Sequence, residues 1–180
     1  MSAPAHSVPA SPAPTREDAF RAAARRWTTG VAVLTTLAGE EVFAKTVSSF
    51  CTLSLDPLLV SAAVARHSPL VAAVRGSGRF AVSVLTDRQI AVARRFATPG
   101  AGRALGGFTA VPMRAEATGA PVLEAALAWF DCRLHGVLPG GDHAVLVGRV
   151  AAADTGHGAP LLYHDGQYRT LAHPSPGVGA

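Results

Sequence analysis

The sequence is poor in cysteine, in aromatic residues and in lysine. Its two cysteines, Cys51 and Cys132, lie far apart and form no C-x-x-C motif, so neither a disulfide framework nor a zinc knuckle is predicted. Reduced thiols are typical of cytoplasmic proteins, and we expect a cytoplasmic location.

Two further absences exclude classes of partner. Aromatic residues make up 6% of the chain and the 16 basic residues are scattered along it, a pattern that does not favour nucleic-acid binding. No segment sustains the roughly 18 apolar residues that a membrane helix needs. We therefore expect no nucleic-acid partner and no membrane partner.

The composition of the remaining chain favours one compact domain. Hydrophobic residues make up 49% of the 180 residues and charged residues 16%, enough to bury a single core. Residues 1–14 are rich in Ala, Pro and Ser and lack the apolar stretch of a secretion signal. We predict a disordered tail over 1–14, one domain over 15–171 and a flexible tail over 172–180.

The hydrophobic periodicity predicts a mainly β protein with helices. Thr15 and Asp18 form a capping-box pattern, after which Phe20 and Trp27 fall on one face of a helix. The turn at Gly39 joins the first two of several antiparallel strands, which favours a closed barrel or a sandwich. Strands are predicted at 30–36, 41–47, 58–64, 79–85, 111–115, 128–138, 143–150 and 163–171, and further helices at 68–75 and 87–97. The residues 106–107 mark a glycine-rich loop, and the core is expected to hold Phe80, Phe130, Trp27 and Trp129.

One motif nearly matches a phosphate-binding loop. Gly39 is followed four residues later by Ala44, Lys45 and Thr46, but the second glycine of the motif is missing. The segment also lies in a predicted β-hairpin, whereas a phosphate-binding loop runs from a strand into a helix. We therefore reject this interpretation.

A metal site and a serine hydrolase are also disfavoured. Cys132 and His135 are three residues apart on a predicted strand, so they point to opposite faces and cannot readily share an ion with Asp142 and His143. The sequence contains no G-x-S-x-G motif. We predict no metal.

The densest polar cluster spans residues 45–54. It holds five hydroxyl side chains and the only lysine, Lys45, between two apolar strands. Two interpretations are open. The hydroxyl groups either satisfy the local backbone of a loop or form a cradle for an anionic cofactor, whose charge the lysine would offset.

Five segments, in order, resemble the short-chain flavin reductases, which are the reductase components of two-component flavin monooxygenases. The segment that resembles the flavin-binding signature is AKTVSSFCTLSLDPLL at 44–59. FRAAARRWTTGVAVLTT precedes it, and RFAVSVLTDRQIAVARRFA, GAPVLEAALAWFDCRL and GDHAVLVGRV with PLLYHDGQYRTL behind it follow. The similarity covers about residues 20–171. The chain departs from the family pattern at Ala44 and Lys45, where Gly and an apolar residue are frequent, at Ser48, where Asn is frequent, and at Leu58, where a second proline is usual.

The resemblance implies a flavin-binding split β-barrel, antiparallel and Greek-key-like, that forms a homodimer. It implies FMN or FAD as the bound flavin and NADH or NADPH as the hydride donor. The implied flavin contacts are Lys45, Thr46, Val47, Ser48, Ser49, Cys51, Thr52, Leu53, Ser54, Ser83, Leu85 and Phe96. His143, preceded by Asp142, is expected to face the flavin where nicotinamide stacks, and there to orient the carboxamide or donate a proton. Lys45 is expected either to contact phosphate or to lie near the pyrimidine end of the ring.

The function that the resemblance implies is an NAD(P)H:flavin oxidoreductase. Such an enzyme would hand diffusible reduced flavin to a partner monooxygenase or halogenase. The alternatives are a non-catalytic flavin- or haem-binding split-barrel protein and a protein that only shuttles flavin. The G-D-H turn favours the reductase, because a carrier needs no histidine facing a nicotinamide.

Overall fold

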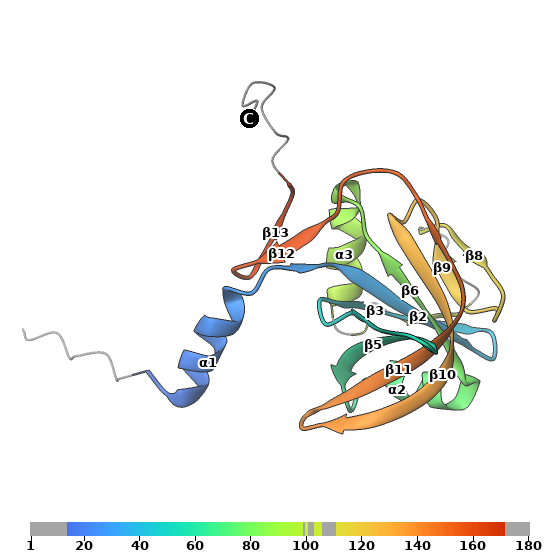
Figure 1. Cartoon of the computed structure of the whole chain (residues 1–180), viewed down its shortest axis with the longest axis horizontal. Helices are drawn as coiled ribbons and strands as arrows, with labels where there is room; N and C mark the ends of the chain where they lie inside the picture. Colours follow the sequence, from blue (N-terminus) through green and yellow to red (C-terminus); the bar gives the residue numbers. More distant parts are fainter. Residues whose placement is uncertain (1–13, 99, 101–102, 106–110, 172–180) are drawn as a thin grey trace, which may run out of the picture.

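The computed structural model describes residues 14–98, 100, 103–105 and 111–171 (Figure 1). The tails predicted over 1–14 and 172–180, apart from Pro14, lie outside the described residues, as does the loop predicted at 106–107. The helices of the described chain are α1 (Arg16–Arg25), α2 (Pro69–Ser77) and α3 (Ile90–Ala97), with a short 3-10 helix η1 (Asp87–Gln89) before α3.

One antiparallel sheet dominates the molecule and confirms the mainly β prediction. Its strands follow the spatial order β4-β5-β11-β10-β6-β2-β3-β7 and curve around a central core (Figure 1). They are β2 (Ala32–Ala38), β3 (Glu41–Val47), β4 (Cys51–Leu55), β5 (Leu58–Ala65), β6 (Arg79–Val84), β7 (Arg103–Leu105), β10 (Ala128–Gly140) and β11 (His143–Thr155).

Two small sheets flank the main one. One contains β1 (Thr29–Gly30), β12 (Leu162–His164) and β13 (Gln167–Arg169), so that the start of the domain pairs with its end. The other contains β8 (Met113–Ala115) and β9 (Pro121–Leu123). The last predicted strand, 163–171, is thus a hairpin that turns at Asp165 and Gly166.

Local sequence signals account for the helix ends. Thr15 and Asp18 form the predicted capping box of α1, with the Thr15 hydroxyl accepting from the Asp18 amide. Helix α2 has Pro at its first position and ends where Gly78 adopts a left-handed φ of 67°. The hairpin β2–β3 turns at Gly39 and Glu40, as its alternating pattern predicts.

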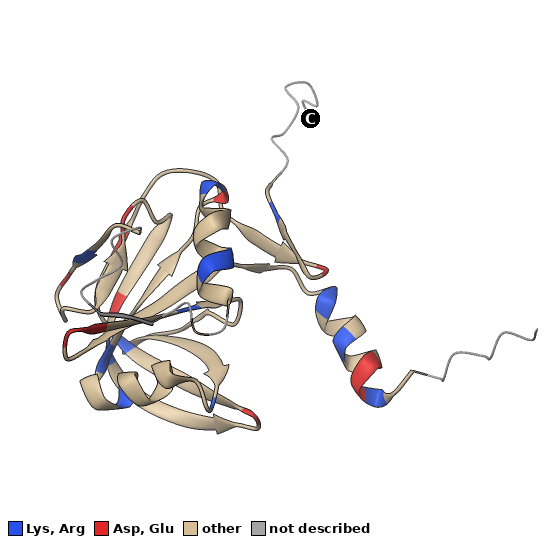
Figure 2. Cartoon of the chain, turned by 180° about the vertical axis from the view of Figure 1, so that it is seen from behind, with Lys and Arg blue, Asp and Glu red and all other residues tan. Residues whose placement is uncertain are grey.

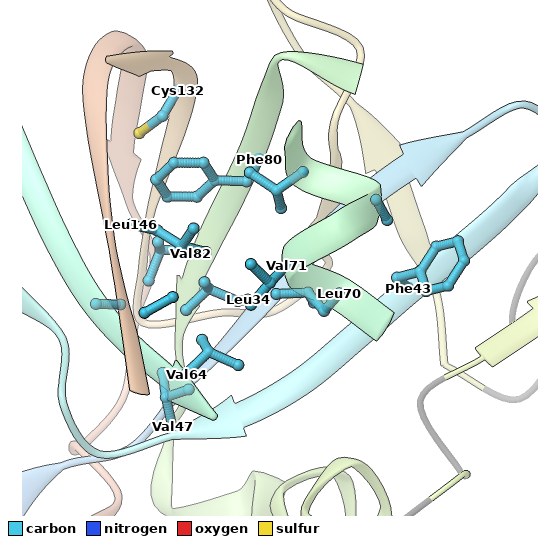
Figure 3. Close-up of a cluster of buried hydrophobic side chains, with 14 of the residues drawn as sticks. Leu34, Phe43, Val47, Val64, Leu70, Val71, Phe80, Val82, Cys132 and Leu146 are labelled. Carbon is cyan, nitrogen blue, oxygen red and sulfur yellow. The ribbon is translucent and has the colours of Figure 1, made fainter. Parts of the chain in front are cut away.

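The main core lies between the sheet and α2 (Figure 3). Phe80, Leu34, Leu146 and Cys132 are fully buried there, and α2 adds Leu70, Val71 and Val74. A second apolar cluster lies under α3 and contains Ala93 and Phe96. A third, smaller cluster contains Ala120, Val122 and Trp129, so the predicted apolar faces meet in three clusters among the described residues.

Trp27 corrects one prediction about the core. Phe80 and Trp129 are buried and Phe130 is half-buried, but Trp27 is 76% exposed. Helix α1 ends at Arg25 and buries none of its own residues, and the backbone then passes into β1, which pairs with β12. All residues of α1 are exposed, and the helix stands to one side of the main sheet (Figure 1).

Candidate active site

A cleft opens between the end of β3 and the end of β5. It has a volume of about 340 Å³ and is lined by residues 45–49 from β3 and the connection after it, by residues 63–65 of β5, and by His143. Five of the predicted flavin contacts, Lys45, Thr46, Val47, Ser48 and Ser49, therefore lie together, and the predicted catalytic histidine lies beside them. Ser48, Ser49 and His143 are exposed, so the cleft is open to solvent.

Ser49 joins the two sides of this cleft. Its hydroxyl donates to the carbonyl oxygen of Ala63 over 2.8 Å and accepts from the Ala63 amide over 3.0 Å. One side chain thus replaces a pair of backbone hydrogen bonds between the β3 end and β5. The spacing of the cleft walls depends on this contact.

The sequence left open whether the hydroxyls of the 45–54 segment satisfy backbone groups or bind a cofactor, and the structure shows some of each kind. The Thr46 hydroxyl donates to the Ala93 carbonyl over 2.8 Å, and the Ser54 hydroxyl accepts from the Asp56 amide, so both satisfy backbone groups. Within the described chain, the hydroxyl of Ser48 has no hydrogen-bond partner. Ser48 is therefore the hydroxyl of this cleft that remains available to a ligand.

Backbone donors and one cation complete the cleft. Ser48 and Ser49 lie between β3 and β4, and their amides make no hydrogen bond with another described backbone group. Among described residues, the Lys45 ammonium donates a hydrogen bond only to the Ala97 carbonyl, at 3.4 Å. Free amides beside a positive charge favour a ligand with carbonyl oxygens or negative charge.

His143 is held at the cleft by its neighbour in the chain. Gly140 pairs with His143, so Gly141 and Asp142 form a two-residue turn, in which Gly141 adopts a φ of 69°. The His143 Nδ1 atom lies 2.7 Å from the Asp142 Oδ1 atom. This hydrogen bond is the main reason why the pKa of Asp142 lies below its ordinary value. Since the carboxylate accepts from Nδ1, we assign Nε2 as the nitrogen free for a ligand.

Seven predicted flavin contacts lie elsewhere. Cys51, Thr52, Leu53 and Ser54 lie on β4, the edge strand, and line neither this cleft nor its neighbours. Ser83 and Leu85 are fully buried. The Ser83 hydroxyl accepts from the Leu123 amide, because β6 is a central strand with β2 and β10 on its two sides. Phe96 is also fully buried, and it lines a separate recess of about 370 Å³ on the other side of Lys45.

The β5 side of the cleft is not among the contacts predicted from the sequence. Ala63 and Ala65 line it, and Ala65 pairs with His143 across β5 and β11. The alternation of small residues at Ser61, Ala63 and Ala65 is the signal that points to this face, since alternate residues of a strand share one side. Small side chains there leave a flat wall.

The residues of the cleft fit a flavin. A flat wall of alanines accommodates a planar ring, the free amides of Ser48 and Ser49 match its carbonyl and nitrogen acceptors, and Lys45 suits the negative charge of its reduced form. Among the described residues, no group of three or more His, Cys, Asp or Glu side chains is placed to hold a metal ion. None of the helices in the described part of the chain has the length and apolar character to cross a membrane.

Fold and cleft together define a mainly β protein with an open cleft at the ends of β3 and β5, and comparisons with known proteins show its family. The flavin reductase like domain matches residues 24–172. The reductase component of 4-hydroxyphenylacetate 3-monooxygenase from Thermus thermophilus is 38% identical over 160 residues, which cover 88% of this chain and 99% of that one. The NADH-dependent FMN reductase AsuE2 of Streptomyces nodosus subsp. asukaensis is 39% identical, with 86% of this chain and 85% of that one covered.

A solved structure gives the same result for the fold. BorF, the flavin reductase component of a bacterial two-component tryptophan halogenase, superposes with a TM-score of 0.81 at 34% identity, covering 87% of this chain and 99% of that one. The chain belongs to the flavin reductase family, and its split-barrel fold is the one that the resemblance implies.

Proposed function

We propose that this protein is an NADH- or NADPH-dependent flavin reductase that reduces FMN or FAD and supplies the reduced flavin to a partner monooxygenase or halogenase. The observation that carries the proposal is the position of His143, fixed by Asp142 at a cleft whose amides and hydroxyl are free. Relatives named as an NADH-dependent FMN reductase and as the reductase components of a monooxygenase and a halogenase support it.

The residues of the cleft suit hydride transfer. A bound flavin supplies a ring that accepts a hydride from reduced nicotinamide, a reaction that needs no nucleophile and no strong base from the protein. The amides of Ser48 and Ser49 bind the ring by its acceptors, and Lys45 favours negative charge at the same end of the cleft. His143 presents Nε2, where it orients a carboxamide or holds a proton.

The edge strand β4 supports the proposed homodimer. Leu53, Leu55 and Leu58 are 53%, 88% and 52% exposed, and they lie on or next to the free edge of the main sheet. A row of exposed leucines on an unpaired edge is a surface that other chains bind readily. A second copy of the chain covers it in our proposal. Leu55→Glu is expected to convert the dimer to a monomer in light scattering, whereas Glu40→Gln, in the distant β2–β3 turn, leaves the mass unchanged.

The proposed cytoplasmic location rests on the cysteines and on the hydride donor. Cys51 and Cys132 are both free thiols. The cytoplasm keeps thiols reduced, and NADH and NADPH are made there. Fractionation of cells that express the protein at its native level tests this location.

The activity is tested by mixing the purified protein with NADH or NADPH and a large excess of FMN or FAD. Loss of the nicotinamide absorbance over many turnovers supports a reductase that releases its flavin. Flavin binding without that loss would instead support the non-catalytic carrier. If neither flavin bound, the proposed function would be wrong.

A further inference from the structure

Three arginines lie side by side on neighbouring strands of the main sheet. Arg133 of β10 pairs with Arg79 of β6 on one side and with Arg149 of β11 on the other. Residues that pair directly across antiparallel strands project from the same face, with Cβ atoms about 4.5–5.5 Å apart. Figure 2 shows basic positions gathered where these strands lie near α2. We call these three residues the arginine row.

The arginine row points away from the main core. Cys132 and Gly148 directly precede Arg133 and Arg149 on their strands, and a Cβ added at Gly148 would lie 2.8 Å from Cβ of the buried Cys132. Consecutive residues of a strand point to opposite faces, so the arginines lie on the outer face of the sheet. Arg133 and Arg149 are exposed there, and Arg79 is half-buried.

Arg79, the half-buried member, is held by a loop. Its Nη1 atom donates to the Thr118 carbonyl over 2.7 Å. The Thr118 amide donates to the Asp131 carboxylate over 2.6 Å, and the Thr118 hydroxyl donates to the other oxygen of that carboxylate. Asp131 is fully buried and forms no ion pair with a described arginine. This acid therefore orders the loop that holds Arg79 and leaves the row without a direct counter-ion.

Within the described chain, no acidic side chain pairs with the two exposed members of the row. All 12 Asp and Glu residues of the sequence lie in the described part. None of them forms an ion pair or a hydrogen bond with Arg133 or Arg149 there. Like charges directly opposite each other on neighbouring strands destabilise a sheet. An anionic ligand from outside the chain would relieve this repulsion.

The width of the row indicates what kind of anion fits it. Neighbouring strands lie about 4.8 Å apart, so the three arginines span about 10 Å, which is wider than one carboxylate or phosphate. Carboxylates at positions i and i+4 of a helix lie about 5–6 Å apart, close to the spacing between neighbouring arginines. Each guanidinium binds a carboxylate through two parallel hydrogen bonds. An acidic helix face therefore fits the row.

The row is separate from the cleft of the candidate active site. His143 begins β11, and Arg149 lies about 20 Å further along the same strand. Arg133 and Arg149 line neither the cleft nor the recess beside Lys45. A ligand on the row thus leaves the cleft free. Since alternate residues of a strand share one side, Arg149 and His143 lie on the same side of β11.

We propose that the arginine row docks an acidic helix of a partner protein. Two carboxylates one helical turn apart bind Arg133 and Arg149, while Arg79 extends the positive surface toward β6. The docked protein lies on the side of β11 on which His143 stands at the cleft. The inference goes beyond the proposed function and does not depend on it, because neither a flavin nor a nicotinamide takes part in the docking.

The test uses a labelled alanine-rich helical peptide with Glu at three positions spaced four residues apart, and a second peptide with Gln at the same positions. Fluorescence anisotropy at low salt measures the dissociation constant of each peptide with the full-length protein. The native protein is expected to bind the Glu peptide and not the Gln peptide. Arg133→Gln and Arg149→Gln are each expected to weaken binding about fivefold, and the double variant more than tenfold.

The matched control is the double variant Arg26→Gln with Arg88→Gln. It removes the same charge from two exposed arginines outside the row and is expected to bind the Glu peptide as the native protein does. Equal weakening in the control would overturn the proposal, because net charge alone would then explain binding. A native protein that binds both peptides equally, or neither, would overturn it as well.

Two further measurements test other occupants of the row. Calorimetry with inorganic phosphate that shows binding lost in the double row variant, without any binding of the Glu peptide, would assign the row to a small anion. A change of mass of the double row variant in light scattering would assign it to a contact between copies of the chain. Either result would overturn the docking proposal. Flavin titration of the native protein tests the proposed function separately, and the row variants are expected to bind flavin as the native protein does.

Discussion

The Nδ1 atom of His143 donates to the Oδ1 atom of Asp142, 2.7 Å away, at the tip of the β10–β11 hairpin. The Arg66 amide holds the Asp142 carbonyl over 3.0 Å, so the turn that carries both residues is anchored to the residue that follows β5. The turn that carries the imidazole is therefore anchored to the end of β5, and the Asp142 carboxylate orients the ring within it.

His143→Ala is expected to lower kcat/KM for NADH roughly 10- to 100-fold, because the group that orients the nicotinamide or holds its proton is lost. Flavin affinity should change little, since the amides of Ser48 and Ser49 remain. Steady-state kinetics and flavin titration measure the two effects. His135→Ala, an exposed histidine on β10 outside the cleft, is the control. Unchanged kinetics in His143→Ala would remove this residue from the mechanism.

Ser49→Ala is expected to weaken flavin binding and to lower the free energy of unfolding by about 1 kcal/mol. The reason is that the Ala63 amide and carbonyl both lose their partner, which loosens the wall of the cleft. Denaturant unfolding and flavin titration are the measurements. Thr155→Ala removes an exposed hydroxyl far along β11 and should alter neither. A Ser49→Ala protein with native flavin affinity would contradict the bridging role.

Gly148→Ala is expected to destabilise the protein by about 1–3 kcal/mol, because the added methyl group overpacks the main core. A Cβ at this position would lie 2.5 Å from Cζ of Phe80 and 2.8 Å from Cβ of Cys132. Thermal or denaturant unfolding measures the loss. Gly136→Ala on the neighbouring strand is the control, since nothing lies within 4 Å of its added Cβ. Equal stability of the two variants would show that β11 does not pack this closely.

The two thiols are expected to react very differently. Burial raises the pKa of Cys132 to about 12, whereas Cys51 is exposed on β4. Iodoacetamide should therefore label Cys51 alone in the native protein at neutral pH, and both cysteines after unfolding, as read by mass spectrometry.

The same pKa shift predicts how stability changes at high pH. Because the unfolded thiol loses its proton near its ordinary pKa of 9.0 and the folded one near 12, the contribution of Cys132 is complete below about 9 and falls as the pH rises toward 12. Cys132→Ala should flatten this fall in denaturant unfolding at alkaline pH. An equally steep fall in that variant would assign it to other groups.

The β2–β3 hairpin shows what sequence alone predicts well. Its alternating apolar residues and the turn at Gly39 are local signals, and the strands form where they indicate. The capping box at Thr15 and Asp18 is equally local, and α1 begins where it predicts. Family resemblance adds the location of the cleft, because it singles out the segment that begins at Lys45.

The contacts that a side chain makes with neighbouring strands are harder to predict from the sequence. Ser83 falls within a segment shared with the family, but its hydroxyl accepts a hydrogen bond from the Leu123 amide. This burial follows from the position of β6 between β2 and β10, which the sequence of the segment does not reveal. Trp27 has the hydrophobicity and spacing of a core residue, but α1 stands away from the barrel. Both outcomes depend on contacts between distant segments, which periodicity does not encode.

The alanine wall of the cleft affects how a bound planar ring would be released. Ala63 and Ala65 line one side of the cleft, and Ser48 and His143, which also line it, are exposed. A planar ring bound against this wall would be open to solvent at the margin that Ser48 and His143 form. The dwell time of the product is then set by a few hydrogen bonds, which suits an enzyme whose product must reach another protein through water.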